Sequence, residues 1–365
     1  MKIIHILAGK ANPNTMNGVN NVVHSIAEEQ TKNGHNVSVL GVANNAIIRH
    51  QFTYELKLFV KNKSVIFPPK KLISEIRNLG KDAKIHIHSA YIPWYPVLVL
   101  YLKFSGRKYV LTPHGAYTPN NFKNNFLKIL YFILVESIIL FFANKIQVIG
   151  KSEINAYTKS FIAAKAIYIP NGCIPKRHNH FNKSDMLIFG YMGRLKIDHK
   201  GLDLLFDGFS SYIRNKGKGR LMLAGDGPDK EKLMKLAKYY NISNRIDFTG
   251  VLFGYDKEKF LTEISFFIHT SRWEGFPIGC VEALSFNTPL LVSKETNLEE
   301  LVTTFCCGLV LKTNVPHEIE KSLFDLQDIF YGDNYSSFID GTRKIVKEKL
   351  SWQNINTQIE FTLYA

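Results

Sequence analysis

Residues 266–284, Phe-Phe-Ile-His-Thr-Ser-Arg-Trp-Glu-Gly-Phe-Pro-Ile-Gly-Cys-Val-Glu-Ala-Leu, contain the pattern that decides the fold. The apolar run 266–269 predicts a buried strand, and Pro277 is typical of the first turn of a helix. Glu274 then lies in the loop at the carboxyl end of the strand, and Glu282 lies eight positions later on the helix. Ligands of open parallel sheets bind beside the carboxyl ends of the strands, so both acids are placed to accept hydrogen bonds from hydroxyl groups of a ligand.

Short β-branched runs alternate with longer helical segments on both sides of this stretch, from the first residue to roughly residue 310. This alternation is typical of repeated βα units and a parallel sheet, so the fold class expected is α/β. Segment 18–33 is the predicted first crossover helix. The predicted strands are 2–7, 36–42, 85–88, 108–112, 145–149, 167–169, 186–192, 220–224, 245–248, 266–269, 290–292 and 308–311.

The chain length of 365 residues is too great for one ordinary core and fits two domains. The polar stretch 176–185 has neither helical nor strand periodicity, and its one apolar anchor is Phe181. It is the predicted linker between an N-terminal domain, 1–175, and a C-terminal domain, 186–350. The amphipathic end, 351–365, lies outside the βα alternation and is expected to pack back on the first domain.

The composition, with 45% hydrophobic and 21% charged residues, is that of a folded globular protein rather than a disordered or fibrous one. The net charge of +15 favours anionic partners such as phosphates or acidic lipids, although a lysine-rich genome explains it equally well. The four cysteines show no Cys-x-x-Cys spacing, which argues against a disulfide framework or a zinc site and suits a reducing cytoplasm.

Residues 126–142 approach the hydrophobicity of a membrane span, but Lys128 and Glu136 interrupt them and their length is marginal. We therefore predict a helix that does not span a membrane. Burial in a protein core is the first interpretation, and partial insertion at an acidic bilayer surface is the second. Cations that favour the second interpretation are Lys103, Arg107, Lys108, Lys123 and Lys128.

The motif Glu274-Gly275-Phe276-Pro277, inside the Glu-x7-Glu spacing, closely resembles the signature of the retaining glycosyltransferases of family four. Members of this family have the GT-B fold, in which two Rossmann-like domains with parallel sheets face each other across a cleft. The resemblance extends in consistent order over roughly residues 2–311. Further similar stretches are Gly190–Leu195 followed by Lys200-Gly201, Leu221–Pro228, Ile246–Gly250 and Ile169–Gly172.

The pair Arg194 and Lys200 has a physical role in such an enzyme. A nucleoside-diphosphate leaving group gains negative charge as the glycosidic bond breaks, and cations aimed at it stabilise the transition state more than the ground state. Without the family context, two surface cations would be the simpler interpretation. The resemblance implies that Glu282 holds the nucleotide ribose and that Glu274 lies beside the transferred sugar; otherwise both are solvated acids, Glu282 near a helix N-terminus.

The N-terminal domain supplies two further candidates. His114 lies in Thr-Pro-His-Gly directly after a predicted strand, and in similar enzymes such a histidine contacts the donor sugar and the reaction centre. Gly18 remains where the family has a paired glycine after the first strand. The predicted catalytic residues are His114, Arg194, Lys200 and Glu274. The predicted donor-binding residues are Gly18, Gly193, Arg194, Lys200, Gly275, Phe276, Pro277, Glu282 and Leu298.

Metal and dinucleotide sites are not expected. His86 and His88 share one face of a strand, but without a third ligand in register they are interpreted as structural, with His88 near a cleft rim. The chain has no Asp-x-Asp pair to hold a metal-bound diphosphate. Gly225-Asp226-Gly227 lacks the third glycine of the dinucleotide fingerprint and does not lie in the first βα turn of its half. At Glu295–Glu299, where many relatives have a Gly-Gly-Ile-type turn, a different turn geometry is implied.

The sequence therefore predicts a metal-independent enzyme without cofactor. It would move a sugar from a nucleoside-diphosphate sugar to a hydroxyl of a glycan or lipid-linked acceptor, with retention, in cell-surface polysaccharide or lipopolysaccharide synthesis. A cytoplasmic enzyme, peripheral on the inner face of the membrane, is expected, and nucleic acid is not an expected partner. The alternatives are an epimerase or phosphorylase of the same fold, or a basic membrane-surface protein without catalysis.

Overall fold

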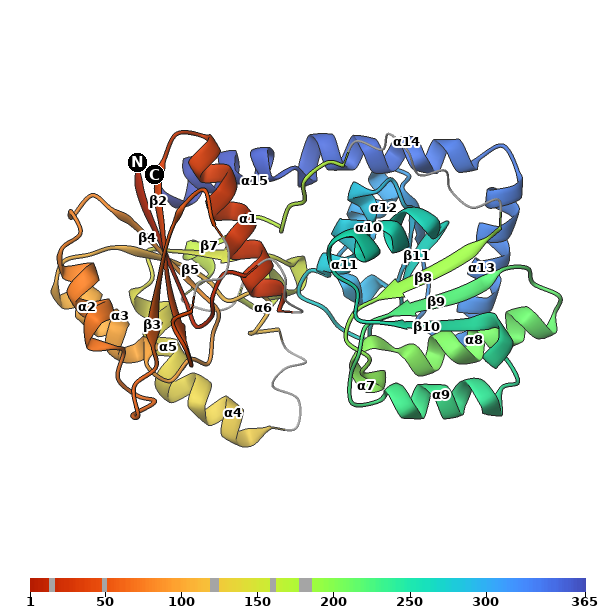
Figure 1. Ribbon diagram of the computed structural model, residues 1–365, viewed down its shortest axis with the longest axis horizontal. Coiled ribbons are helices and arrows are strands. Elements are labelled where there is room, and N and C mark those ends of the chain that lie inside the picture. Colours follow the sequence, from red (N-terminus) through yellow and green to blue (C-terminus); the bar gives the residue numbers. More distant parts are fainter. Residues whose placement is uncertain (13–16, 48–50, 119–124, 158–161, 177–185) are drawn as a thin grey trace. The chain divides into compact units, whose positions relative to one another are not determined.

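The computed structural model describes residues 1–12, 17–47, 51–118, 125–157, 162–176 and 186–365. The chain forms two compact units (Figure 1): the first comprises 1–171 together with 352–365, and the second comprises 172–351. The first unit thus ends four residues before the predicted boundary at 175. Of the predicted linker, residues 177–185 lie outside the described residues.

The first unit is built on a sheet of seven parallel strands in the order β3-β2-β1-β4-β5-β6-β7. The order reverses between β1 and β4, which makes this pair the topological switch point, the usual place of a ligand in such sheets. The strands are β1 (Lys2–Leu7), β2 (Asn36–Ala43), β3 (Glu55–Val60), β4 (Lys84–His88), β5 (Tyr109–Thr112), β6 (Lys145–Val148) and β7 (Ala166–Tyr168).

Alternate residues of these strands pack against helices because successive side chains of a strand point to opposite faces. Ile4, Ile6, Ile85 and Ile87 join a buried apolar cluster with one group of helices. These helices are α2 (Lys70–Arg77), α3 (Tyr95–Phe104) and α5 (Ser137–Phe142). The first crossover helix, α1 (Gly18–Lys32), begins with Asn17 as its cap, whose side chain accepts a hydrogen bond from the amide of Val19.

The prediction of a helix over 126–142 is confirmed. The segment consists of α4 (Phe126–Tyr131), a π-helical turn (Phe132–Glu136) and α5. Glu136 is fully buried and accepts hydrogen bonds from the Tyr117 hydroxyl and the Tyr91 amide. Among the described residues, no helix combines the length and the apolar character that a membrane span needs.

The C-terminal segment belongs to the first unit. Helix α15 (Trp352–Gln358) contacts α1, and the turn that follows (Ile359–Leu363) contacts β6. Burial of Ile355, Ile359 and Leu363 explains the amphipathic pattern of this segment. Tyr364 is buried in the same unit.

The second unit has six parallel strands in the order β10-β9-β8-β11-β12-β13, so β8 and β11 flank its switch point. The strands are β8 (Ile188–Met192), β9 (Arg220–Ala224), β10 (Ile246–Gly250), β11 (Phe266–His269), β12 (Leu290–Val292) and β13 (Gly308–Val310). Its helices are α7 (Ile197–Lys200), α8 (Leu202–Arg214), α9 (Lys230–Tyr239), α10 (Gly254–Glu263), α11 (Ile278–Ser285), α12 (Glu299–Thr304), α13 (Pro316–Tyr331) and α14 (Tyr335–Ile345). The predicted α/β class, with parallel Rossmann-like sheets, is confirmed.

Candidate functional site

The predicted residues of the second unit gather around its switch point. Arg194 follows the carboxyl end of β8 by two residues, and Lys200 ends the short helix α7 that comes next. Glu274 follows the end of β11 by five residues, in the loop that leads to α11. Because β8 and β11 are neighbours, these loops emerge from one edge of the sheet. That edge is where an open parallel sheet binds its ligand.

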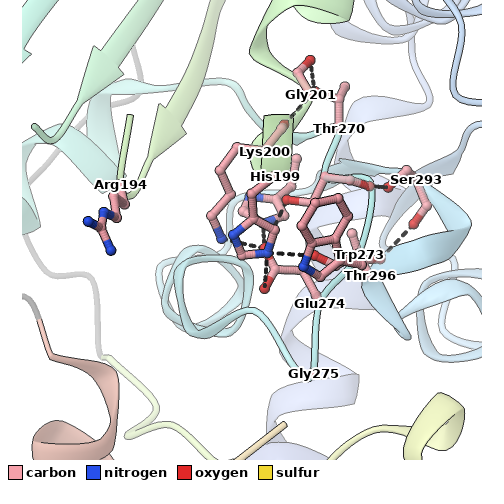
Figure 2. Close-up of polar contacts among 12 residues, drawn as sticks. Arg194, His199, Lys200, Gly201, Thr270, Trp273, Glu274, Gly275, Ser293 and Thr296 are labelled. Carbon is pink, nitrogen blue, oxygen red and sulfur yellow. Dashed lines mark hydrogen bonds and ion pairs between the residues drawn. The ribbon is translucent and has the colours of Figure 1, made fainter. Parts of the chain in front are cut away.

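Lys200 and Glu274 form the centre of the site (Figure 2). The Lys200 ammonium donates to Oε1 of Glu274 in an ion pair whose side chains are only 14% and 10% exposed. Nε2 of His269 and Oγ of Ser271 donate to the same oxygen at 3.0 and 2.8 Å. Nε2 of His199 lies 3.9 Å from the other carboxylate oxygen. A cation and an acid are thus held together with little contact to solvent.

The surroundings of Glu274 keep it ionised. Burial alone raises its pKa, but the hydrogen bond from His269 and the charge of Lys200 outweigh burial and hold the pKa of the Glu274 carboxyl well below its ordinary range. Burial lowers the pKa of His269, which therefore donates to Glu274 as a neutral ring. Burial also lowers the pKa of His199 to about 4, and its Nε2 donates to the carbonyl of Trp273.

The two loops of the site are fastened to each other. Arg272 makes a bidentate ion pair with Asp203 at 2.9 and 2.7 Å, and its amide donates to the carbonyl of His199. Gly201 has a φ of +61°, and a Cβ on it would lie 2.1 Å from the carbonyl oxygen of Thr270. Only glycine allows this close approach of the two backbones. Lys200 is therefore placed against Glu274 by backbone packing as well as by charge.

The turn at Glu295–Glu299 supports the same loop. Asn297 has a φ of +61°, a conformation that asparagine tolerates better than most residues. Its side-chain amide donates to the carbonyls of Glu274 and Gly275 at 2.7 and 3.0 Å. The amide of Glu274 also donates to the carbonyl of Glu295. An asparagine thus provides the left-handed turn in this chain and holds the site loop as well.

The structure does not bring Arg194, Lys200, Glu274 and Glu282 into one cluster. The side chain of Arg194 is exposed and lies apart from Lys200 and Glu274 in Figure 2. Glu282, on α11, instead pairs with Lys257 of α10 at 2.8 Å. The remaining predicted residues are at the same edge: Gly193 follows β8, Gly275 and the buried Phe276 follow Glu274, Pro277 caps α11, and the buried Leu298 caps α12.

The glycines of Gly225-Asp226-Gly227 have a packing role. A Cβ on Gly225 would lie 1.9 Å from the carbonyl oxygen of Gly193, and one on Gly227 would lie 2.3 Å from that of Leu195. The loop after β9 therefore packs directly on the backbone beside Arg194. This contact explains the two glycines without a dinucleotide.

The first unit contains His114 and Gly18. Gly18 is the first residue of α1, and His114 is partly exposed in the loop after β5, with a φ of +56°. Nε2 of His114 lies 3.1 Å from Nδ1 of His88. His88 is fully buried, so its predicted place at a rim is wrong. His5, His86 and His88 each offer a ring nitrogen within 4.8 Å of the others, and His5 is the neighbour that the sequence analysis missed.

The first unit also has a cavity of about 1150 Å³. It is lined by residues of β3, α2, α3 and the segment 61–69, and it includes neither Gly18 nor His114. This cavity is separate from the predicted site residues of its unit.

Two family models match the chain. The model of glycosyl transferases group 1 matches residues 174–328, and the model of Glycosyltransferase Family 4 matches residues 16–177. Together they span residues 16–328 and meet close to the boundary between the two structural units. The protein belongs to the group 1 glycosyltransferases.

The sequence relatives of this glycosyltransferase match it over different lengths. The glycosyltransferase MJ1059 of Methanocaldococcus jannaschii is 32% identical over 125 residues, which are 34% of this chain and 29% of that protein. A glycosyltransferase of Haemophilus influenzae is 23% identical over 84% of this chain and 85% of its own length. A lipopolysaccharide 1,6-galactosyltransferase of Escherichia coli is 34% identical over 28% of this chain and 29% of that enzyme. The match thus spans less than a third of the length of the first and last of these relatives.

Solved structures show that this glycosyltransferase has the GT-B fold. The Anabaena protein Alr3699/HepE, in complex with UDP, is 17% identical with a TM-score of 0.74 over 100% of this chain and 99% of that one. The lipopolysaccharide outer core galactosyltransferase WaaB is 18% identical with a TM-score of 0.66 over 98% of this chain and 99% of that one. The predicted GT-B class is confirmed.

The sequence analysis missed several residues around Glu274 in this glycosyltransferase. They are His199, His269, Ser271, Arg272 and Asn297. A signal existed for two of them, because His269 ends the strand at the switch point and Ser271 follows it. The others come from loops that approach Glu274 only in the folded chain.

Proposed function

We propose that this glycosyltransferase moves a sugar from a nucleoside-diphosphate sugar, with UDP as the first nucleotide to test, to an acceptor hydroxyl. The observation on which this rests is the Lys200–Glu274 pair at the switch point of the second sheet. An ammonium at this edge neutralises charge that develops on a departing diphosphate, and an ionised acid beside it accepts hydrogen bonds from sugar hydroxyls. The UDP in the complex of the Anabaena relative supports the choice of nucleotide.

We propose that transfer proceeds with retention and without a protein nucleophile or a metal ion. An acid whose pKa lies well below its ordinary range is a weak base at neutral pH, so Glu274 is a poor group to deprotonate the acceptor. The departing phosphate takes that proton, as the family resemblance implies. Proton NMR of the first product formed gives its anomeric configuration; a product with the opposite configuration to the donor contradicts retention.

The residues are tested by transfer assays on purified variants. Glu282→Ala and Arg194→Ala are expected to lose most donor turnover while keeping a native circular-dichroism spectrum. Matched controls are Glu263→Ala and Arg343→Ala, because these side chains form exposed surface ion pairs. Near-normal transfer by both site variants contradicts the assignment. Incubation with donor alone separates this function from epimerisation, which yields an isomerised sugar nucleotide without acceptor.

We propose that the acceptor is a lipid-linked or surface glycan at the inner face of the cytoplasmic membrane. The lipopolysaccharide galactosyltransferase of Escherichia coli among the relatives supports this acceptor class. In the first unit, the helical segment 126–142 exposes large apolar side chains: Phe126, Leu127, Ile133, Leu134 and Phe141. Lys128 lies in the same segment, with its ammonium 4.8 Å from the centre of the Tyr91 ring. Apolar side chains beside cations favour the surface of an acidic bilayer.

Vesicle flotation tests this surface. We expect the protein to float with phosphatidylglycerol vesicles at low salt, and to do so less at high salt because ions screen the attraction. Leu127→Gln with Leu134→Gln is expected to abolish flotation. Phe361→Gln is the matched control, since Phe361 is an equally exposed apolar residue of the first unit outside this segment. Flotation that survives the double change, or that is absent from the wild type at low salt, contradicts the membrane proposal.

A further inference from the structure

Four histidines meet at the switch point of the first unit. His5 lies on β1, His86 and His88 lie on β4, and His114 follows β5. His5 and His86 are paired in register across the two strands. The first three are fully buried on the face of the sheet opposite to the isoleucines that pack against α2 and α3. A buried polar cluster of this kind is stable only when each group finds a hydrogen-bond partner.

The partners form a chain of hydrogen bonds. The backbone at one end of it fixes which group donates and which accepts in each bond. The carbonyl oxygen of Ile169 can only accept, so it takes a hydrogen bond from Nε2 of Gln147 at 3.0 Å. Oε1 of Gln147 then accepts from the hydroxyl of Thr112 at 2.8 Å, and that hydroxyl oxygen accepts from Nε2 of His86 at 2.6 Å. Nδ1 of His86 is left as the acceptor, and the Tyr364 hydroxyl donates to it at 2.9 Å.

The same direction continues to His114. The hydroxyl oxygen of Tyr364 accepts from Nε2 of Gln30 at 3.4 Å, which leaves Oε1 of Gln30 to accept from Nε2 of His5 at 2.8 Å. Nδ1 of His5 accepts from Nε2 of His88 at 2.8 Å, and Nδ1 of His88 accepts from Nε2 of His114 at 3.1 Å. Each neutral imidazole in the chain is thus required to have its proton on Nε2.

The rings are neutral because burial opposes their charged form. Burial lowers the pKa of His5 to about 4 and that of His114 to about 3, and it lowers the pKa values of His86 and His88 well below the ordinary value. A metal ion is a poor explanation for the cluster. Both ring nitrogens of His5, His86 and His88 are already engaged in hydrogen bonds, which a metal would have to break.

We propose that this chain of hydrogen bonds positions His114 as a neutral ring with its proton on Nε2. Nδ1 of His114 then presents a lone pair to a hydroxyl group of the donor sugar. The role in the reaction rests on the proposed function, whereas the tautomer does not. Within the described part of the chain, Nδ1 of His114 has no hydrogen-bond partner, and the residue is partly exposed. In this tautomer, Nδ1 of His114 accepts a hydrogen bond and cannot donate one. Gln30, His5 and His88 are positioning residues, because they act only through His114.

The variant Gln30→Met tests the chain. Without the acceptor, an N–H on Nε2 of His5 would be buried and unpaired, which costs more than a bare ring nitrogen. The three rings His5, His88 and His114 are therefore expected to reverse, placing the proton of His114 on Nδ1. Gln30→Glu is the rescue variant, since its carboxyl can still accept from His5. Tyr109→Phe is the structural control, because it removes a buried hydroxyl that bonds the Ile139 carbonyl outside the chain.

The readout is the ¹⁵N NMR spectrum of histidine-labelled protein, with His114 assigned by His114→Gln. We expect an Nε2–H tautomer in the wild type, in Gln30→Glu and in Tyr109→Phe, and an Nδ1–H tautomer in Gln30→Met. An Nδ1–H tautomer of His114 in the wild type, or an unchanged tautomer in Gln30→Met, contradicts the proposed chain of hydrogen bonds. This result does not depend on any enzymatic activity.

The role of His114 in the reaction is tested on the same variants with a donor that supports transfer. We expect Gln30→Met to lower kcat/KM about tenfold for the natural donor, while Gln30→Glu stays near wild type. We also expect the wild type to discriminate against a deoxy donor analogue, which lacks the hydroxyl that bonds Nδ1 of His114, and Gln30→Met to lose this discrimination. If the tautomer of His114 reverses but kcat/KM stays unchanged, the proposed contact with the sugar is wrong and the chain of hydrogen bonds is confirmed. If the wild type transfers no sugar from any donor, the proposed function fails while the NMR result still decides the chain.

Discussion

Glu274→Gln is the substitution that most directly probes the centre of the site. It exchanges a carboxylate for an amide of the same size, so that hydrogen bonds from His269 and Ser271 to the remaining oxygen are still possible. It removes the negative charge beside Lys200, whose side chain is 14% exposed. Removing one partner of a buried ion pair costs about 3–5 kcal/mol, because the other charge stays desolvated. Since both side chains keep slight contact with solvent, we expect a loss of about 3 kcal/mol, which lowers the melting temperature of this unit by roughly 6–12 °C.

Differential scanning calorimetry measures this loss. Asp340→Asn is the matched control, because it makes the same acid-to-amide change in an exposed ion pair with Arg343 and is expected to leave the transition almost unchanged. Adding Lys200→Met to Glu274→Gln is expected to restore part of the loss, since the unpaired charge is then gone, with a coupling energy of about 1–3 kcal/mol. The reasoning is refuted if Glu274→Gln shifts the transition no more than Asp340→Asn does, or if the two changes at the site are additive.

Three further outcomes are expected. Acidification from pH 7 to pH 5 should destabilise the first unit. The pKa of an unfolded histidine is about 6.5 and burial lowers that of folded His5 to about 4, so the unfolded state binds more protons between these values. At pH 5, His5 alone is expected to lower the free energy of unfolding by about 2 kcal/mol. Calorimetry at both pH values checks this, and His5→Gln should reduce the dependence. Gly201→Ala should lower the melting temperature far more than Gly250→Ala, because both positions have positive φ but only Gly201 would place a Cβ 2.1 Å from a carbonyl oxygen; equal losses would contradict the clash. In native protein, Ellman's reagent should modify the exposed Cys306, and it should reach the buried Cys173, Cys280 and Cys307 only on unfolding. Rapid reaction of more than one thiol would show that the second unit opens in the native protein.

The strands and helices that have a clear burial pattern were predictable from the sequence. β11 and β12 were predicted to the residue because each is a short run buried on both faces. β3 was missed because it is the edge strand of its sheet and contains Glu55 and Lys57. An edge strand with one open side needs no apolar pattern.

The candidate site was predictable only in part. Glu274 was predicted from its place after a strand and from the family resemblance, Lys200 was predicted from the resemblance together with its charge, and their contact is observed. The partners of Glu274 come from separate loops, and no periodicity connects them in sequence. The chain that ends at His114 was beyond prediction for the same reason: His86 bonds a tyrosine 278 positions away. Hydrogen bonds of this kind depend on tertiary packing and not on local pattern.

Isothermal titration of UDP tests the central claim that Lys200 binds the diphosphate of the donor. A charge-assisted hydrogen bond to phosphate contributes about 1.5–3 kcal/mol, so Lys200→Met is expected to weaken UDP binding by roughly 10–100-fold. Lys259→Met is the control, because Lys259 forms an exposed ion pair with Glu263 and should leave the affinity unchanged. UDP bound equally well by the wild type and by Lys200→Met, or no binding of any nucleoside diphosphate by the wild type, would contradict the account.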